Sequence, residues 1–214
     1  MELKVIGVSG FARSGKDSLA TYLINKYKGL FKRFALADEL KLDLNSFLKE
    51  KADISAFTIV PEEKELIRDM MVAYGKIKRH QTQGRYWTGL LQPKINECIA
   101  NKQIPIVTDI RYDQFPEDEC FWLQNYNRGQ LIHITRLGTD LLALPAPNND
   151  EALNNPRLKA KANFYIRWST FRGEDPTREI EEIVQRQMEG LIIEIEKRYN
   201  EFKQWQEFDS QARG

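Results

Sequence analysis

The sequence predicts an α/β fold built around a parallel β-sheet, and three observations lead to this prediction. Short apolar runs alternate along the chain with segments of helical periodicity. A glycine-bearing turn joins the first apolar run to the first helical segment. The length of 214 residues fits one domain with a full core. Strands that alternate with helices are joined by right-handed crossovers, so we expect the strands to lie parallel.

The chain opens with a strand, a turn and an amphipathic helix. Residues 3–8 form a short, mostly apolar run, as expected for a strand that is buried on both faces. The turn follows over residues 9–15. Beyond it, Leu19, Leu23 and Tyr27 share one face of a helix. This order of elements is typical of the start of an α/β fold.

The alternation continues to the end of the chain. Further strands are expected at residues 31–37, 104–110, 130–135 and 162–168. Helices are expected at residues 38–49, 62–73, 86–100, 117–127 and 176–208. Residues 138–160 are rich in Pro, Asn and Asp and lack clean periodicity, so we expect a mobile loop or lid there.

Composition excludes several classes of protein. The net charge of +1 gives no global basic field that would recruit nucleic acid or a membrane. Cys98 and Cys120 match neither a disulfide framework nor a zinc site, and we expect both to be buried thiols. No apolar run approaches the length of a membrane span, and the first residues resemble a charged strand rather than a signal peptide. We therefore expect a cytoplasmic protein.

One motif carries most of the functional evidence. Residues 10–16, Gly-Phe-Ala-Arg-Ser-Gly-Lys, have the spacing of a Walker A phosphate-binding loop. Glycines let such a loop curl so that its N–H groups point at phosphate oxygens, and the following helix adds its positive dipole end. Lys16 is expected to reach the β- and γ-phosphates of ATP. The expected ATP-binding residues are Arg13, Ser14, Gly15, Lys16, Asp17 and Ser18.

The position after the lysine departs from the general pattern. It normally holds the Ser or Thr that coordinates Mg²⁺, whereas here Asp17 stands there and Ser18 follows. Either Ser18 supplies the hydroxyl group through a small shift, or the metal is held through Asp17 and water. Asp109, at the end of an apolar strand, is a second candidate for the Mg²⁺ site. The alternative for Asp109 is a capping role in a strand-to-loop turn.

With this departure the sequence resembles the deoxynucleoside monophosphate kinases of bacteriophages, which also place Asp between the lysine and the hydroxyl residue. The matching stretches are residues 9–18, 34–41, 107–112 and 133–138, with Arg68, Gly75 and residues 85–87 between them. The resemblance implies a single three-layer P-loop domain with a five-stranded parallel sheet, a helical substrate-binding region at about residues 50–100 and a short lid at about 136–160. It also implies transfer of the γ-phosphoryl group of ATP to a deoxynucleoside monophosphate, with Mg²⁺.

Arginines supply the remaining catalytic candidates beside Lys16. Arg111 lies two residues after Asp109 and could hold a phosphate through two hydrogen bonds, although a surface ion pair is the alternative. Arg136 ends the fourth strand and opens the expected lid, where an arriving cation would stabilise the transferring phosphoryl group. Arg157 is a weaker candidate of the same kind.

A second group of residues is expected to bind the acceptor nucleotide. The basic run at 76–85 precedes Trp87, and arginine with tryptophan suits a phosphate group and the face of a base. The expected acceptor residues are Asp38, Lys41, Arg68, Arg85, Trp87, Asp109 and Arg111. Alternatives remain open for three of them: Asp38 as a helix N-cap, Trp87 as a core residue and Arg68 as an exposed ion-pair partner.

Other functions fit parts of the sequence. A P-loop kinase for a different phosphorylated metabolite, such as dephospho-coenzyme A or phosphomevalonate, would use the same loop. A nucleotide-dependent nucleic-acid-binding module would use the basic stretch at 76–87, although the near-neutral charge argues against it. A non-catalytic relative would keep only nucleotide binding. Near the C-terminus, Phe202, Trp205 and Phe208 either dock in the core or form a homodimer patch.

Overall fold

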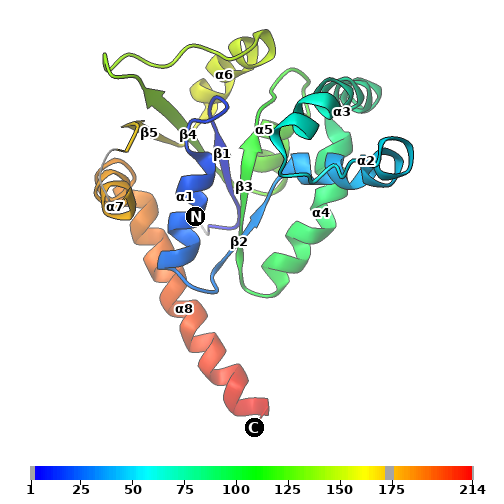
Figure 1. The fold of residues 1–214 in the computed structure, drawn as a ribbon. Helices are drawn as coiled ribbons and strands as arrows, with labels where there is room; N and C mark the ends of the chain where they lie inside the picture. The colour runs from blue at the N-terminus through cyan, green and yellow to red at the C-terminus, as the bar shows by residue number, and fades with distance from the viewer. Residues whose placement is uncertain (1–2, 172–175, 214) are drawn as a thin grey trace.

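The computed structural model describes residues 3–171 and 176–213, which form a three-layer α/β fold (Figure 1). The central sheet has five parallel strands in the order β2-β3-β1-β4-β5. They are β1 (Ile6–Ser9), β2 (Phe31–Phe34), β3 (Ile104–Ile110), β4 (Gln130–Leu137) and β5 (Phe164–Ser169). The predicted parallel sheet is therefore confirmed. β2 is shorter than expected because the next helix is already capped at Ala35.

Helices cover both faces of the sheet. One face carries α1 (Lys16–Lys26), α7 (Pro176–Gln187) and α8 (Glu189–Arg213), which share a core with Ile6 and Val8. The other face carries α4 (Arg85–Ala100), α5 (Glu119–Phe121), the π-helix η1 (Trp122–Tyr126) and α6 (Asn149–Lys161). These pack in a second core with Val5 and Val107. Alternate side chains along the first strand thus enter separate cores, as expected for a strand that is buried on both faces.

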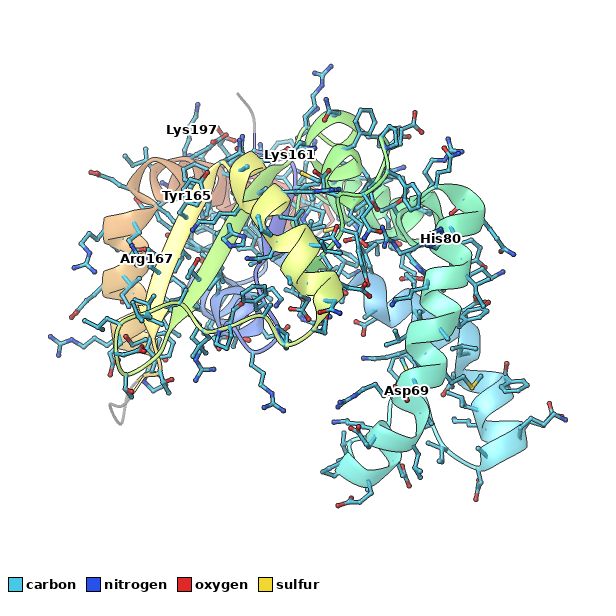
Figure 2. All side chains as sticks on the ribbon, turned by 90° about the horizontal axis from the view of Figure 1, so that it is seen from above. Asp69, His80, Lys161, Tyr165, Arg167 and Lys197 are labelled. Carbon is cyan, nitrogen blue, oxygen red and sulfur yellow. The ribbon has the colours of Figure 1, made fainter. Side chains whose placement is uncertain are left out.

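Two helices extend from this body as an arm. α2 (Leu36–Ala52) follows β2, and α3 (Pro61–Thr82) runs back beside it before α4 begins (Figure 2). The arm has a small core of its own, formed by Leu44, Leu48, Ala56 and Ile67. The helix expected at 62–73 is longer than predicted, because α3 continues to Thr82 through most of the basic run. Arg79, which lies in this additional part of the helix, is buried.

The segment 138–160, where a loop or lid is expected, is helical from residue 149 onward, which corrects the prediction of a loop for that half. The Asn148 side chain caps α6 by accepting a hydrogen bond from the Glu151 amide at 2.9 Å. The helix buries only Leu158 among its apolar residues and contains Pro156, so its sequence has little helical periodicity. The irregular part is confined to residues 138–148.

The C-terminal helix also differs from the prediction. The single helix expected at 176–208 is divided into α7 and α8 at Met188. Phe202 is buried in the main core, whereas Trp205 and Phe208 are exposed, so the predicted core docking holds for the first of the three aromatic residues only. Both cysteines are buried and unpaired, as expected. None of the described helices is long and apolar enough to cross a membrane.

We expect Gly7→Ala to destabilise the protein by about 1 to 3 kcal/mol. A Cβ atom at this position would lie 2.2 Å from Cδ2 of Leu123 in the core. Gly89, inside α4, is the matched control, since nothing lies within 4 Å of a Cβ atom there. Gly89→Ala should be neutral or stabilise by up to about 1 kcal/mol. Urea unfolding of both variants measures the difference, and equal effects would contradict the packing of η1 against β1.

Candidate functional site

The loop between β1 and α1 has a backbone that favours glycine at two positions. Gly10 has a φ of 134° and Gly15 a φ of 94°. A Cβ atom would also collide at both positions. It would lie 2.4 Å from the carbonyl oxygen of Ile134 at Gly10, and 2.7 Å from the Trp168 ring at Gly15. The two glycines of the motif are therefore required for the curl that the spacing predicts.

Lys16 folds back across this loop. Its ammonium group donates hydrogen bonds to the carbonyl oxygens of Gly10 at 2.9 Å and Phe11 at 2.7 Å, and the residue is buried. Burial, followed by the charge of Arg111, lowers the pKa of Lys16 to about 8, although nearby carboxylates oppose this shift. The lysine is thus held over the loop, where it can meet an anion.

The start of α1 faces a cavity beside the loop. The helix begins at Lys16 without a side-chain cap, and N–H groups in a first helical turn have no acceptor within the helix. Residues 15–18 line a cavity of about 540 Å³, which we call the loop cavity. The positive end of the helix dipole therefore acts on this space. Ser14 does not line it and instead faces a smaller cavity behind the loop.

Side chains from the ends of β4 and β5 fix the loop from outside. The Trp168 indole N–H donates to the Ser14 carbonyl oxygen at 2.8 Å. The Arg136 guanidinium donates to the Arg13 carbonyl oxygen at 2.7 Å and to the Thr170 hydroxyl at 2.6 Å. Arg136 also lines the loop cavity, as its expected role requires. Sequence reasoning did not assign a role to Trp168; its position at the end of a strand was the available signal.

A second and larger cavity of about 760 Å³ lies between the arm and the body. We call it the helical cavity. It meets the loop cavity at four residues that line both: Ala37, Lys41, Asp109 and Arg111. Three of these four were predicted to bind the acceptor. The sheet therefore places a phosphate-type loop and a second ligand-sized space next to each other at the carboxyl ends of its strands.

Asp109 joins the sheet to the arm. Its two carboxylate oxygens accept hydrogen bonds from the amides of Leu36 at 2.7 Å and Ala37 at 2.8 Å, so it caps the start of α2. Burial raises the pKa of Asp109, and these hydrogen bonds and the charge of Arg111 oppose the rise. The sequence left open a capping role in the strand-to-loop turn; Asp109 is indeed a cap, but of α2 rather than of that turn. Asp38, by contrast, is not the N-cap of α2, because that helix begins two residues earlier.

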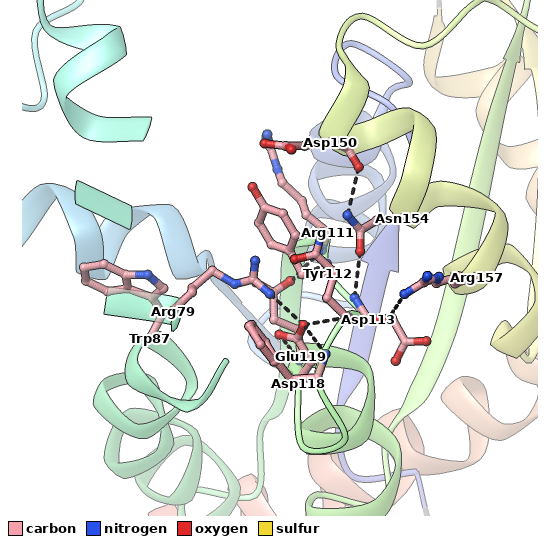
Figure 3. Close-up of polar contacts among 12 residues, drawn as sticks. Arg79, Trp87, Arg111, Tyr112, Asp113, Asp118, Glu119, Asp150, Asn154 and Arg157 are labelled. Carbon is pink, nitrogen blue, oxygen red and sulfur yellow. Dashed lines mark hydrogen bonds and ion pairs between the residues drawn. The ribbon is translucent and has the colours of Figure 1, made fainter. Parts of the chain in front are cut away.

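Arg111 lies where the two cavities meet, and a buried carboxyl group positions its backbone. Glu119 accepts hydrogen bonds from the amides of Arg111 at 2.6 Å and Tyr112 at 3.0 Å (Figure 3). Burial is the main cause that raises the pKa of Glu119 to about 8. The Arg111 guanidinium is half-exposed and lies 3.8 Å from the Glu151 carboxylate. The alternative of an ion pair thus holds for Arg111 in part.

Arg79 is a member of the helical cavity that sequence reasoning missed. Its guanidinium lies 3.5 Å from the centre of the Tyr112 ring and donates to the buried Asp118 carboxylate at 2.6 Å (Figure 3). Its Nε is buried without a hydrogen-bond partner among the described residues. The only available signal was its place in the basic run, four residues after Gly75, which is also buried.

The other residues of the predicted acceptor set divide between the cavity and the surface. Trp87 and Arg68 both line the helical cavity. Trp87 is nevertheless packed in the core beside Tyr74 and Tyr86, and Arg68 forms an exposed ion pair with Glu65 at 3.0 Å. The alternatives left open by the sequence, a core position for Trp87 and an exposed ion pair for Arg68, are therefore also present in the structure.

Arg85 and Arg157 do not reach the helical or the loop cavity. Arg85, the first residue of α4, pairs with Glu117 at 2.9 Å on the surface and donates to the Thr82 carbonyl oxygen at 3.2 Å. Arg157 donates to the Asp113 carbonyl oxygen at 3.1 Å from the far half of α6. Arg85 thus lies apart from the other residues that were predicted to bind the acceptor. Arg157 lies apart from Arg136, with which it shared the predicted role of a lid cation.

The residues expected around Mg²⁺ form an incomplete set by themselves. Asp17, the alternative ligand through water, is held by Arg33 at 3.0 Å. Asp38, which was predicted to bind the acceptor, is shared between Arg33 and Lys41. Among the described residues there is no group of three or more His, Cys, Asp or Glu side chains that could hold a metal ion. Mg²⁺ usually needs only one or two protein ligands when phosphate oxygens and water complete its shell. Ser18 and Asp109 both line the loop cavity and fit this pattern.

The five-stranded parallel sheet, the glycine loop between β1 and α1, and the lysine folded over it define an α/β fold of the P-loop type. No family model and no curated protein matches the chain. Solved structures with a similar course of the chain include the shikimate kinase of Aquifex aeolicus (16% identity, TM-score 0.39, covering 88% of this chain and 98% of that chain). The shikimate kinase of Acinetobacter baumannii in complex with shikimate has 13% identity and a TM-score of 0.38, covering 86% and 92%. A structure from the PezAT toxin–antitoxin system of Streptococcus pneumoniae has 15% identity and a TM-score of 0.38, covering 94% and 87%. Likenesses at this level assign neither an activity nor a substrate.

We expect Asp109→Ala to lower the free energy of unfolding by about 2 to 4 kcal/mol, because it leaves the amides of Leu36 and Ala37 without their acceptor. Asp38→Ala is the control. Its carboxylate is partly exposed in the same helical turn, and its loss should cost less than about 1 kcal/mol. Urea unfolding without nucleotide or Mg²⁺ measures both. An unchanged stability of Asp109→Ala would mean that this residue has no capping role.

Proposed function

We propose that the protein is an ATP-dependent deoxynucleoside monophosphate kinase, which transfers the γ-phosphoryl group of ATP to the acceptor phosphate and releases ADP and a deoxynucleoside diphosphate. One observation carries the proposal. The loop cavity, with Lys16 over its loop, opens directly into a larger cavity that combines cationic side chains with apolar and aromatic ones. An acceptor that has both a phosphate group and a flat base suits this combination.

The helical cavity has an excess of positive charge. Its cationic residues are Lys41, Lys64, Arg68, Lys76, Arg79 and Arg111. Among the described residues that line the cavity, only the carboxyl groups of Asp109 and Glu119 stand against them, and burial raises the pKa of both, to about 8 for Glu119. The Nε of Arg79 adds an unused buried donor. An anionic ligand is therefore favoured, and guanidinium groups can bind its oxygens through two hydrogen bonds.

The wall of the same cavity offers an apolar surface. Leu36, Leu40, Phe57, Ile67, Met71 and Trp87 contribute to it. Aromatic and aliphatic side chains stabilise the face of a base by burial and stacking. The volume of about 760 Å³ lies in the range of small-molecule sites.

The proposed chemistry requires positioning and charge rather than a general base. The oxygen of a monophosphate is already an anion at neutral pH, so no proton has to be removed from the acceptor. Lys16 would hold the donor phosphates, Arg111 would approach the acceptor phosphate at the junction of the cavities, and Arg136 would add positive charge at the loop. Ser18 and Asp109 would hold Mg²⁺, which supplies neutralisation of the phosphate charge when bound.

A kinase for another phosphorylated metabolite, of the dephospho-coenzyme A or phosphomevalonate type, would use the same loop and the same cations. What favours the deoxynucleotide is the resemblance of residues 9–18 to the phage enzymes and the apolar wall of the cavity. A nucleic-acid-binding module has less support. Residues 76–82 of the basic run lie on α3, where Arg79 is buried and Lys76 pairs with Asp150 at 2.8 Å.

We expect the wild-type protein to release ADP from ATP with deoxynucleoside monophosphates, and not with nucleosides that lack the phosphate. Lys16→Ala and Arg111→Ala should each lower kcat by about 100-fold or more, because each removes a charge that stabilises the transferring group. Arg85→Ala, an arginine paired outside both cavities, should stay within about twofold. A coupled ADP assay across deoxy- and ribonucleoside monophosphates, dephospho-coenzyme A and phosphomevalonate measures this. Turnover with only the last two would refute the proposed acceptor.

We also expect the affinity for ATP to fall as the pH rises above about 8. The pKa of Lys16 is about 8 in the nucleotide-free protein, and phosphate oxygens favour the charged ammonium form. Below this pH the lysine is already protonated, whereas above it each binding event must take up a proton, at a cost of up to tenfold in Kd per pH unit. Calorimetry between pH 7.5 and 10 measures the slope. Lys16→Arg should abolish the slope, because guanidinium does not titrate in this range; a flat wild-type profile would contradict the prediction.

A further inference from the structure

The carboxylate of Glu151 lies on the phosphate-binding loop. Its Oε2 accepts a hydrogen bond from the amide of Ala12 at 2.7 Å, and its Oε1 lies 3.8 Å from the Arg111 guanidinium. The Glu151 side chain is 12% exposed, whereas its partners Ala12 and Arg111 are more open to water. A loop amide and a cation beside the loop are the partners that an oxygen of a bound phosphate would have. Glu151 thus occupies an anion position.

The neighbouring residue makes an equivalent contact on the other side. Asp150 pairs with Lys76 at 2.8 Å, and Lys76 lines the helical cavity. The first turn of α6 therefore directs one carboxylate to the loop and one, that of Asp150 (Figure 3), to the cation-rich arm. Because both contacts are made by the same helical turn, a movement that breaks one of them would disturb the other.

The two ends of α6 are held differently. Toward its C-terminus, Leu158 is buried in the core, and Lys161 pairs with Asp113 at 2.7 Å. The first turn follows the irregular segment 138–148, and charged contacts hold it to the loop and the arm. Competing anions can replace such contacts, whereas the buried anchor of the other end is unaffected by them.

We propose that Glu151 is a built-in competitor of the nucleotide, which occupies the loop until donor phosphates displace it and the first turn of α6 withdraws. A carboxylate and a phosphate at this position would repel each other strongly in a partly buried site. The apparent affinity for ATP is then reduced by the fraction of protein in which Glu151 is bound to the loop. This inference rests on the part of the proposed function that places nucleotide phosphates on the loop.

Removal of the charge alone tests the inference. Glu151→Gln keeps the shape of the side chain and an oxygen that can accept from Ala12, so the fold should be retained, which the melting temperature checks. We expect Glu151→Gln to bind Mg²⁺-ATP about tenfold more tightly than the wild type in calorimetry. Glu151→Ala, which also removes the acceptor, should bind at least as tightly. Glu117→Gln is the matched control, since it removes a carboxylate that is likewise paired with an arginine but lies outside both cavities, and its Kd should be unchanged.

A second readout follows the helix itself. In hydrogen exchange, amides of residues 149–153 should exchange faster in the wild type when Mg²⁺-ATP is added, because the first turn of α6 loses its contact. The inference is overturned if Glu151→Gln binds ATP as the wild type does or more weakly, or if exchange of this turn slows on binding. In either case wild-type turnover with a deoxynucleoside monophosphate would leave the proposed function intact. Absence of ATP binding in both the wild type and the variants would refute both.

Discussion

The hydrogen bonds from the amides of Leu36 and Ala37 to the Asp109 carboxylate are the interaction on which the geometry of the site depends. They join the end of β3 to the first turn of α2, which is the first helix of the arm. The helical cavity lies between that arm and the body, and it meets the loop cavity at Asp109 itself. One buried carboxylate thus sets the distance between two ligand-sized spaces. Asp109 thus stands near the end of a strand, caps a helix and lines both cavities where they meet.

Many of the cations around this junction already have a carboxylate partner. Lysine and arginine side chains surround both cavities, yet several have internal carboxylate partners: Arg33 with Asp17, Lys41 with Asp38, Lys76 with Asp150 and Arg111 with Glu151. These pairs are partly exposed, and pairs of this kind add little stability. In the nucleotide-free protein these carboxylates therefore offset part of the positive charge that lines the two cavities. An anion that enters must compete with carboxylates that are already present.

Local sequence features predicted the parts of the fold that local physics decides. The glycine spacing predicted the loop, because positive φ and close approach at Gly10 and Gly15 leave no alternative residue. Apolar runs predicted all five strands. α6 was missed because charged contacts and a single buried leucine hold it, and such contacts have no period in the sequence. Arg79 was missed because it stands among several cations on one helix, and only the packing of α3 against the body decides which of them is buried.

Arg79, Asp118 and Glu119 form a buried polar cluster beside the helical cavity. This cluster explains why the backbone of Arg111 has a defined position. A buried ion pair such as that of Arg79 and Asp118 is weak evidence for stability, since apolar residues could fill the same space. Asp118, however, also accepts hydrogen bonds from the amides of Gln114 and Glu119, and so it orders the turn that follows β3. That turn carries Glu119 back to the amide of Arg111. Buried charges therefore fix the backbone of the arginine at the junction from below, while the exposed end of its side chain remains able to change partners. A site that must hold its cations in place and still exchange one anion for another needs this division between a fixed backbone and a replaceable contact.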